Sequence, residues 1–257
     1  MLYQLKSYAK FLLRSTNQHG VHSPFVYDLL TKCFYDSKKY PEYVLLKNSR
    51  QNISSSSEII EVTDFGQGSR VFKSNKRKVS QIAKHVGISS KRQRLLFRLV
   101  RYLNPNDILE LGTSLGMSTI AMAMGNPASK IHTVEGCTNT AKVAQNQFYA
   151  LQLEQIELDT NPFDTYFVEN HSTHYDMIFV DGNHNKESTL QYFELLLQNI
   201  SPDSVIIFDD IYWSPQMTKA WDIIRHHPKV SVSIDTFQWG IVFFRTEQQK
   251  EHFTIRL

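Results

Sequence analysis

An alternation of short apolar runs with amphipathic helical segments constrains this fold more than any other feature. It begins at residue 107 and continues through the rest of the sequence. The runs contain few polar residues, so we expect strands that are buried on both faces. The expected strands are DILELG (107–112), KIHTVE (130–135), IEL (156–158), YDMIFVDG (175–182), SVIIFDD (204–210), VSVSID (230–235) and GIVFFR (240–245). The expected helices cover 118–125, 138–152, 186–200 and 214–227. This order predicts an α/β fold with a doubly wound, mostly parallel sheet.

The residues before 107 are expected to be mainly helical. Apolar residues at helical spacing predict a helix over 3–14, whose stripe we expect to pack against the domain. That stripe consists of Leu5, Tyr8, Phe11 and Leu12. Ser23-Pro24 has the pattern of an N-cap followed by the first helical residue, so a helix is expected from there to about Phe34. A further helix is expected over 89–103.

We expect the chain to divide near residue 84. Residues 1–84 would form a helical extension with a basic lid, and 85–257 would form the sheet domain. The lid is the cationic, glycine-containing segment 64–87, which we expect to lead into a short helix at 79–85. Apolar residues at helical spacing also allow the helix at 3–14 to touch a membrane, but burial against the domain is the favoured interpretation.

Composition and charge limit the function classes. The 257 residues are 41% hydrophobic and 21% charged, which is ordinary for a globular protein. The two cysteines are too few for a disulfide framework or for a zinc site on their own. The first residues carry Lys6, Lys10 and Arg14 among their apolar residues, so no secretory signal is expected. We therefore expect a cytoplasmic location and no membrane partner.

The net charge of +3 is unevenly distributed. Residues 65–106 contain 11 basic and no acidic residues. This segment could attract an anionic partner, or it could be a solvated surface that balances the acidic remainder of the chain. Phe72 is the one aromatic residue among the cations of the lid, which disfavours an RNA-stacking surface.

The first expected strand runs into Glu110-Leu-Gly112-Thr-Ser-Leu-Gly116. Two glycines four residues apart allow a sharp turn and a close approach to a ligand. The spacing differs from that of the dinucleotide and nucleotide-triphosphate loops. Glu135 ends the second strand, 19 residues after Gly116, where a carboxylate can accept both hydroxyls of a ribose. An ordinary strand-to-helix turn and a solvated acid are the alternative interpretations.

These motifs resemble those of the class I S-adenosylmethionine-dependent methyltransferases, over about residues 85–245. The resemblance implies a Rossmann-like fold and S-adenosyl-L-methionine as cofactor. It implies that the loop lines the methionine part, that Ser118 holds its carboxylate and that Glu135 holds the ribose. The full set of cofactor-binding residues that it implies is Glu110, Gly112, Thr113, Ser114, Gly116, Ser118, Glu135, Gly136, Cys137, Asn161 and Asp181. In this set Gly136, Cys137 and Asn161 would lie near the adenine.

Three carboxylates follow two of the later strands. Asp181 ends one strand, and Asp209 and Asp210 end the next. Carboxylates that converge at one edge of a parallel sheet repel one another unless a cation neutralises them, so we expect these three as ligands of a divalent metal, Mg²⁺ above all. The alternatives are a metal-free Asp181 that touches substrate, and capping of the next helix by the Asp209-Asp210 pair.

His184 follows Asp181 by three residues and can take a proton from a hydroxyl, so His184 and Asp181 are the expected catalytic residues. The arrangement resembles the metal-dependent O-methyltransferases of the catechol and macrolide-sugar kinds, with a histidine where the catechol branch has lysine. Tyr212 and Trp213 are expected at the rim of the substrate pocket, and Trp239 in the core.

The expected function is O-methylation of a small hydroxylated molecule, assisted by a divalent metal. The positive charge of the basic segment is compatible with an anionic substrate. The alternative is an RNA or protein methyltransferase that docks through residues 70–101. A nucleic-acid partner is the less favoured of the two, and a homodimer is compatible with the sequence. A cofactor-binding protein without catalysis is a third interpretation.

Overall fold

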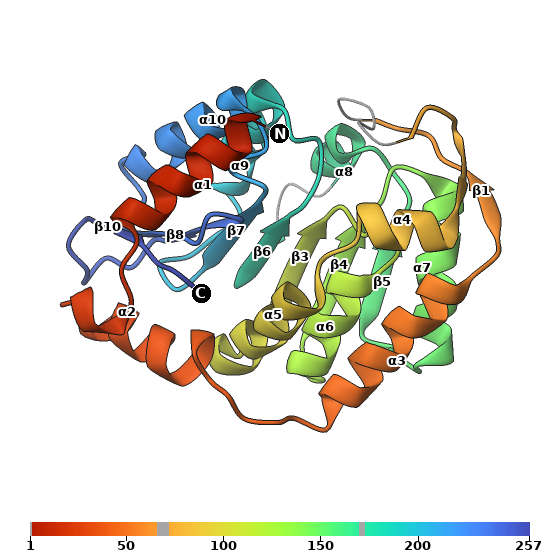
Figure 1. The fold of residues 1–257 in the computed structure, drawn as a ribbon, viewed down its shortest axis with the longest axis horizontal. Helices are drawn as coiled ribbons and strands as arrows, with labels where there is room; N and C mark the ends of the chain where they lie inside the picture. Colours follow the sequence, from red (N-terminus) through yellow and green to blue (C-terminus); the bar gives the residue numbers. More distant parts are fainter. Residues whose placement is uncertain (1, 66–71, 170–172) are drawn as a thin grey trace. The chain divides into compact units, whose positions relative to one another are not determined.

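The computed structural model describes residues 2–65, 72–169 and 173–257 (Figure 1). The chain forms two compact units, and each is described by itself. The central unit is continuous in sequence and covers Asp36–Glu169. The terminal unit combines Met1–Tyr35 with Asn170–Leu257. The expected boundary at residue 84 does not coincide with either limit, and it stays a prediction.

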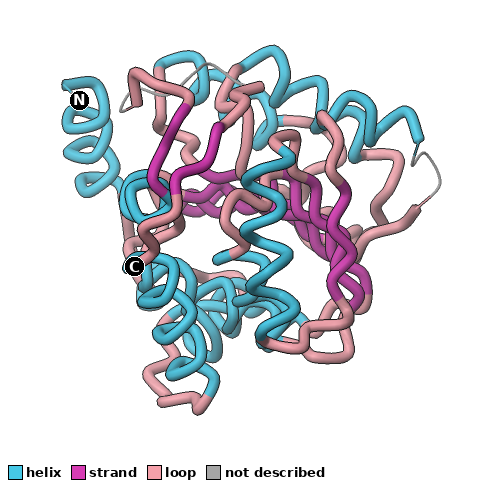
Figure 2. Tube along the Cα trace, turned by 90° about the vertical axis from the view of Figure 1, so that its right-hand side faces the viewer, coloured by secondary structure: helices cyan, strands magenta, loops and turns pink. Residues whose placement is uncertain are grey.

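The central unit contains three parallel strands in the order β3, β4, β5. Helices alternate with these strands along the chain, as Figure 2 shows by colour. The bounds are α3 Glu42–Ser55, β1 Ile59–Glu61, β2 Lys76–Lys78, α4 Val79–His85, α5 Ser90–Leu103, β3 Asp107–Leu111, α6 Met117–Gly125, β4 Lys130–Val134, α7 Thr138–Ala150, β5 Ile156–Asp159 and α8 Phe163–Glu169. β1 and β2 pair as a separate antiparallel two-stranded sheet.

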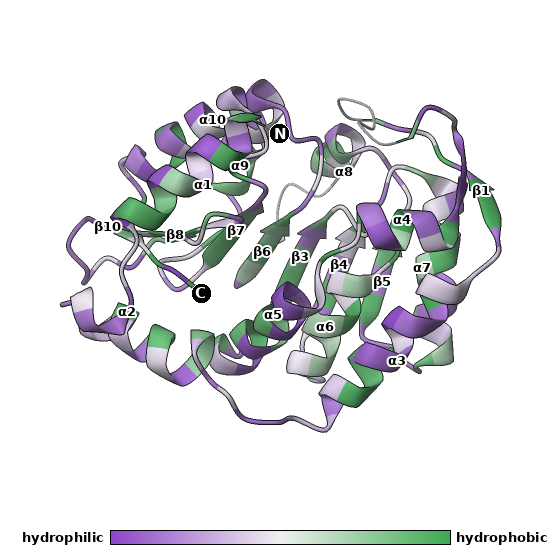
Figure 3. Ribbon diagram, in the orientation of Figure 1, coloured by the Kyte–Doolittle hydropathy of each residue, from purple (hydrophilic) through white to green (hydrophobic). Residues whose placement is uncertain are grey.

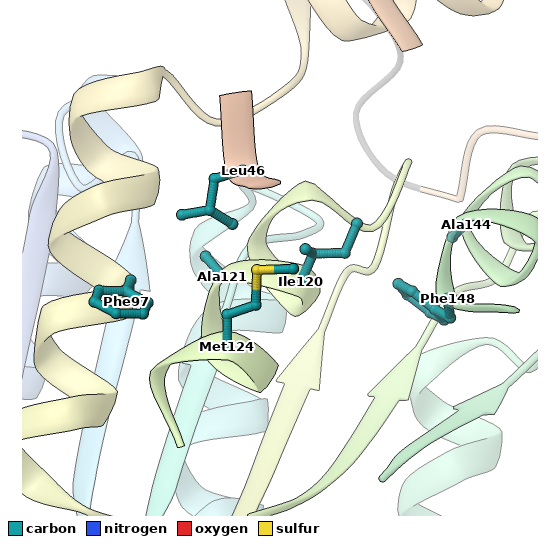
Figure 4. Packing of buried hydrophobic residues seen from close by; sticks show 7 residues of the cluster. All are labelled: Leu46, Phe97, Ile120, Ala121, Met124, Ala144 and Phe148. Carbon is teal, nitrogen blue, oxygen red and sulfur yellow. The ribbon is translucent and has the colours of Figure 1, made fainter. Parts of the chain in front are cut away.

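The helix α5 forms where its capping signal and stripe predict it. The Ser89 hydroxyl accepts a hydrogen bond from the Arg92 N–H, and Asn104 ends the helix in a left-handed conformation. Its apolar stripe packs on α6 in a cluster that also receives a side chain from α3 (Figure 4). The buried members of the cluster are Leu46, Phe97, Ile120, Ala121, Met124, Ala144 and Phe148. This packing fixes α6 and the loop that precedes it.

The terminal unit contains five strands in the order β10, β8, β9, β7, β6. β6 and β7 are parallel, β9 is antiparallel to both β7 and β8, and β10 is parallel to β8. The bounds are α1 Leu2–Arg14, η1 Gln18–Gly20, α2 Pro24–Leu29, η2 Leu30–Phe34, β6 Met177–Val180, α9 Lys186–Leu196, β7 Val205–Asp209, α10 Pro215–His226, β8 Val232–Asp235, β9 Trp239–Phe243 and β10 Glu251–Thr254. Thr16 forms a parallel bridge with Ile255, so residues from both ends of the sequence meet in this unit.

The strand residues are buried as the apolar runs predict. Every residue of β6, β7, β8 and β9 is buried, and Trp239 lies in the core with 1% of its surface exposed. The expectation of a doubly wound, mostly parallel α/β fold with N-terminal helices is confirmed, and β9, between β7 and β8, is the antiparallel strand of this part of the sheet. No helix among the described residues is both long and apolar enough to span a bilayer.

The expected burial of the first helix is wrong for most of its stripe. Phe11 is buried, but Leu5 is 62% exposed, Tyr8 45% and Leu12 36%. A periodic stripe shows which residues share a helix face, but it does not show which face meets the protein. The short helix expected at 79–85 is α4, with the same bounds. Residues 66–71 of the expected lid lie outside the described residues.

Candidate functional site

The loop after β3 has the backbone that its glycines predict. Gly112, Ser114 and Gly116 all have positive φ angles, of 107°, 49° and 78°. A Cβ atom on Gly116 would lie 2.6 Å from the Phe148 ring, so the loop tolerates no larger residue there without rearrangement. The N–H groups of Gly112 and Thr113 both donate to Val134 O, at 2.9 and 3.2 Å, and tie the loop to β4.

Glu110 is fully buried beneath this loop. One of its oxygens, Oε2, accepts hydrogen bonds from the hydroxyls of Thr119 and Thr133, at 2.5 and 2.6 Å. Burial raises the pKa of Glu110, and hydrogen bonds from Ser118, Thr119 and Thr133 act in the opposite direction. The hydroxyls of Thr113 and Thr133 are 2.6 Å apart, so the Thr113 side chain is hydrogen-bonded in the interior. Glu110 thus supports the loop through these hydrogen bonds, and cofactor binding by Glu110 stays a prediction.

Glu135 connects the loop to the end of β4. Its Oε2 accepts from the Ser114 N–H at 2.8 Å, and its Oε1 accepts from the Cys137 N–H at 2.9 Å. Burial raises the pKa of Glu135, the two backbone N–H groups lower it, and the charge of Asp64 raises it further. Each oxygen has a second lone pair, which leaves acceptor capacity for two hydroxyl groups. The residues present therefore fit an adenosine-containing ligand at this carboxylate.

The residues after Glu135 are covered by the segment that follows β1. A Cβ atom on Gly136 would lie 2.6 Å from the Phe65 ring, and the Thr63 N–H donates to Cys137 Sγ at 3.3 Å. Asn139 Nδ2 donates to Glu61 O at 2.8 Å. Residues 61–65 therefore pack against the side of the loop where the resemblance implies an adenine. Sequence analysis did not identify Phe65, because an aromatic residue in an irregular segment has no periodic pattern.

Asn161 follows β5, as expected, and its side-chain amide donates to Asp159 Oδ1 at 2.8 Å. Gln93 is a second residue that sequence analysis missed. It is 1% exposed, and its Nε2 donates to Met117 O at 2.9 Å, which fixes the end of the glycine loop. Gln93 precedes Leu96 by three residues and Val100 by seven residues, which places it on the inward face of α5. This spacing could have identified Gln93 as a buried polar residue from the sequence.

A second group of candidate side chains lies in the terminal unit, after β6 and β7. His184 Nε2 is 4.0 Å from Asp181 Oδ1 and 4.0 Å from Asp210 Oδ2. These three side chains are each between 22% and 32% exposed, so a small molecule can reach them. Asn183 and Asp210 adopt positive φ angles, of 56° and 53°, a backbone strain that is common at functional sites.

Asp209 has a different environment from its neighbour. It is 5% exposed, and its Oδ1 accepts from the Asp210 N–H at 2.9 Å. Among the described residues, no group of three or more His, Cys, Asp and Glu side chains is arranged to hold a metal ion. The three carboxylates thus do not fit a metal site as they stand, and metal binding by Asp181, Asp209 and Asp210 stays a prediction.

Aromatic side chains border this group. The Trp213 ring centroid lies 5.6 Å from that of His184, consistent with the expected position at a pocket rim. Tyr212 instead donates its hydroxyl to Asp235 Oδ2 at 2.6 Å and stacks on Phe237 at 4.9 Å. Burial is the largest cause of the raised pKa values of both Tyr212 and Asp235. Tyr212 therefore serves the packing of the terminal unit.

Some cations of the basic segment 70–101 contact other side chains of the central unit. Arg77 is 8% exposed and lies 3.6 Å from Asp64, which favours a structural role for this residue. Arg94 lies over the Tyr43 ring, and Arg101 lies over the Tyr40 ring. Both of these arginines are exposed, as are most of the other described cations of the segment, so docking through it stays a prediction. Arg70 lies outside the described residues.

Comparison with known proteins identifies the kind of domain. Residues 109–211 match the family model described as a methyltransferase domain. The chain is 30% identical over 131 residues to a catechol O-methyltransferase of Niastella koreensis. This alignment covers 49% of this chain and 58% of that protein. It is 28% identical over 125 residues to catechol O-methyltransferase domain-containing protein 1 of Mus musculus, which covers 46% of this chain and 47% of that protein. The matches thus span about half the length of these relatives.

Solved structures show the same fold. An SAH-bound methyltransferase from Podospora anserina superposes with a TM-score of 0.63 at 15% identity, covering 88% of this chain and 97% of that one. An O-methyltransferase from Bacillus cereus in complex with SAH superposes with a TM-score of 0.56 at 18% identity, covering 81% and 92%. These superpositions show that the chain and the two methyltransferase structures share one fold.

Proposed function

We propose that this chain, whose residues 109–211 match a methyltransferase domain, transfers a methyl group from S-adenosylmethionine to an oxygen of a small hydroxylated molecule. The observation that carries the proposal is the position of Glu135. Its carboxylate is anchored by the Ser114 and Cys137 N–H groups at the glycine loop, and it keeps acceptor capacity on both oxygens.

The loop would receive the cofactor through its backbone. Gly112 and Gly116 allow the chain to approach a ligand closely, and Glu135 would accept hydrogen bonds from the two ribose hydroxyls. Glu110 and its three hydroxyl partners keep the loop in this conformation. Phe65 would contact the adenine from the side of Gly136. Bound S-adenosylmethionine supplies a methyl group on a positively charged sulfur, which is already a good leaving group.

His184 would remove the proton from the acceptor hydroxyl. The Asp181 and Asp210 carboxylates, each 4.0 Å from Nε2, flank the ring at this position. In the overall reaction the methyl–sulfur bond breaks, a methyl–oxygen bond forms and the hydroxyl proton passes to His184 Nε2. The metal part of the sequence prediction enters no step of this proposal.

The test is product formation from S-adenosylmethionine with a panel of catechols, other phenols and sugars. Catechols belong in the panel because both curated relatives carry that name. The proposal predicts S-adenosylhomocysteine and an O-methylated product, and a loss of turnover of about a hundredfold or more in His184→Ala. Product that forms with RNA or a peptide alone would favour the alternative acceptors. An absence of calorimetric heat with S-adenosylmethionine at millimolar concentration would refute the proposal as a whole.

The role of a metal is tested separately in the same assay. Activity that survives complete removal of divalent ions by a chelator would support proton removal by His184 without a metal. Activity that is lost with the chelator and returns with Mg²⁺ would support the expected ligands Asp181, Asp209 and Asp210.

A further inference from the structure

The helix α1 presents an apolar face to solvent. Leu2 is 68% exposed, Leu5 is 62% exposed and Leu13 is 88% exposed. At 3.6 residues per turn these three residues, with Ala9 and Leu12, fall within an arc of about 100°. Figure 3 shows apolar colour along this helix next to polar segments. Five neighbouring apolar side chains on one exposed helix face are typical of a contact surface.

The opposite face of α1 holds the helix on the terminal unit. Phe11 is buried, and its ring lies 5.5 Å from that of Phe237. The Tyr3 hydroxyl donates to Thr218 Oγ1 at 2.7 Å, and Ser7 is buried beside them. Because this face is anchored at three successive turns, the helix cannot turn its leucines inward without losing these contacts.

The charges on α1 are all of one sign. Lys6, Lys10 and Arg14 follow one another at a spacing of four, so each is turned about 40° further from the apolar face than the one before. Lys6 lies at the edge of that face, Lys10 lies beyond it, and Arg14 lies on the anchored side; the helix contains no acidic residue. Lys10 and Arg14 also line a cavity of about 370 Å³, together with Lys219, Arg225 and the carboxylates of Asp222 and Asp235. Arg225 lies 2.6 Å from Asp222, so the cations that border the apolar face come from α1.

The exposed leucines and the neighbouring cations of α1 distinguish between two occupants of this face, a second copy of the chain and an anionic bilayer. A second copy of the chain that pairs through the same face would bring the Lys6 and Lys10 pairs of both copies together, with no acid on either α1 to neutralise them. An anionic bilayer accepts leucines into its acyl boundary and attracts cations to its headgroups. We infer that α1 lies on the surface of an anionic lipid bilayer, with its leucines inserted and Lys6 and Lys10 at the level of the phosphates. This departs from the expectation that no membrane is involved.

Vesicle binding of the full chain tests the inference. The protein is floated with vesicles of phosphatidylcholine alone and with vesicles of phosphatidylcholine mixed with phosphatidylglycerol. We expect binding to the mixed vesicles that falls as salt rises, and little binding to phosphatidylcholine alone. The double variant Leu5→Ser/Leu13→Ser should lower the partition coefficient about tenfold or more, and Lys6→Gln about fivefold.

The double variant Val44→Ser/Leu45→Ser is the matched control. These residues of α3 are 60% and 47% exposed, so the control removes exposed apolar surface elsewhere and should bind vesicles like the wild type. Circular dichroism and urea unfolding verify that every variant is folded. The inference is overturned if the wild type does not bind anionic vesicles, or if the α1 variant binds as well as the wild type. It is also overturned if the chain instead forms a dimer that Leu5→Ser/Leu13→Ser dissociates.

Discussion

The substitution Glu135→Gln tests the cofactor half of the proposed site. In the structure each carboxylate oxygen accepts one backbone N–H, from Ser114 at 2.8 Å and from Cys137 at 2.9 Å. Glutamine has one acceptor oxygen, so one N–H would face an amide group that cannot accept its hydrogen bond. Loss of a hydrogen bond to a charged acceptor costs about 1.5–3 kcal/mol. Removal of a buried charge offsets part of this, so we expect a net destabilisation of about 1–2 kcal/mol.

The same substitution should weaken cofactor binding more than it weakens the fold. One of the two ribose hydroxyls would lose its acceptor, which costs about 1.5–3 kcal/mol, or on the order of tenfold to a hundredfold in Kd. Calorimetric titration with S-adenosylmethionine measures the affinity, and urea unfolding measures the stability. Glu157→Gln is the control, because the Glu157 side chain is 77% exposed and should change both quantities little. An unchanged Kd in Glu135→Gln would refute the assignment of the ribose to this carboxylate.

Three further substitutions test the supports of the two units. Burial raises the pKa of Glu110 above its ordinary value of about 4.5. The wild type should therefore lose stability relative to Glu110→Gln as the pH rises above that value. Unfolding free energies measured against pH test this, and parallel curves for the two proteins would contradict it. Gly116→Ala should destabilise by about 2–5 kcal/mol in urea unfolding, from the positive φ and the Phe148 contact, and a change under about 0.5 kcal/mol would contradict the loop geometry. Tyr212→Phe should cost about 1–3 kcal/mol because Asp235 loses a buried donor, whereas unchanged thermal unfolding would show that this hydrogen bond contributes little.

Strong periodicity made most elements predictable from sequence. The strand at 204–210 contains a continuous apolar run, the strand at 107–112 contains a run interrupted by Glu110 alone, and β3 and β7 lie within these strands. α3 was missed because its buried stripe is short and mixed, with Leu46 and Ile53 separated by Ser49, whose hydroxyl donates to Gln147. Such a helix depends on tertiary contacts that a local pattern does not contain.

β10 was missed for a related reason. Glu251–Thr254 has little apolar pattern, and it is a strand because it pairs in parallel with β8. α8 begins at Phe163, in a segment where no regular pattern was found. In both cases the ordering contacts come from residues distant in sequence or from burial that composition does not reveal.

The site could be predicted in part. Glu110, the glycine loop and Glu135 lie together because their spacing follows the order of two adjacent parallel strands. The acidic cluster was predicted as a trio, but strand position does not determine where a side chain points. Asp210 adopts a positive φ and faces His184, whereas Asp209 bonds back to the Asp210 N–H.

The division of the chain into a continuous and a discontinuous unit has a consequence for biosynthesis. All strands of the central unit are synthesised before most of the second segment of the terminal unit, so the central unit can fold while translation continues. Residues 1–35 are made before the central unit, but their partners include Ile255, which is made after it. Residues 1–35 must therefore wait for the segment that follows the central unit, and a nascent-chain stall before Thr218 would leave α1 without its anchors Thr218 and Phe237.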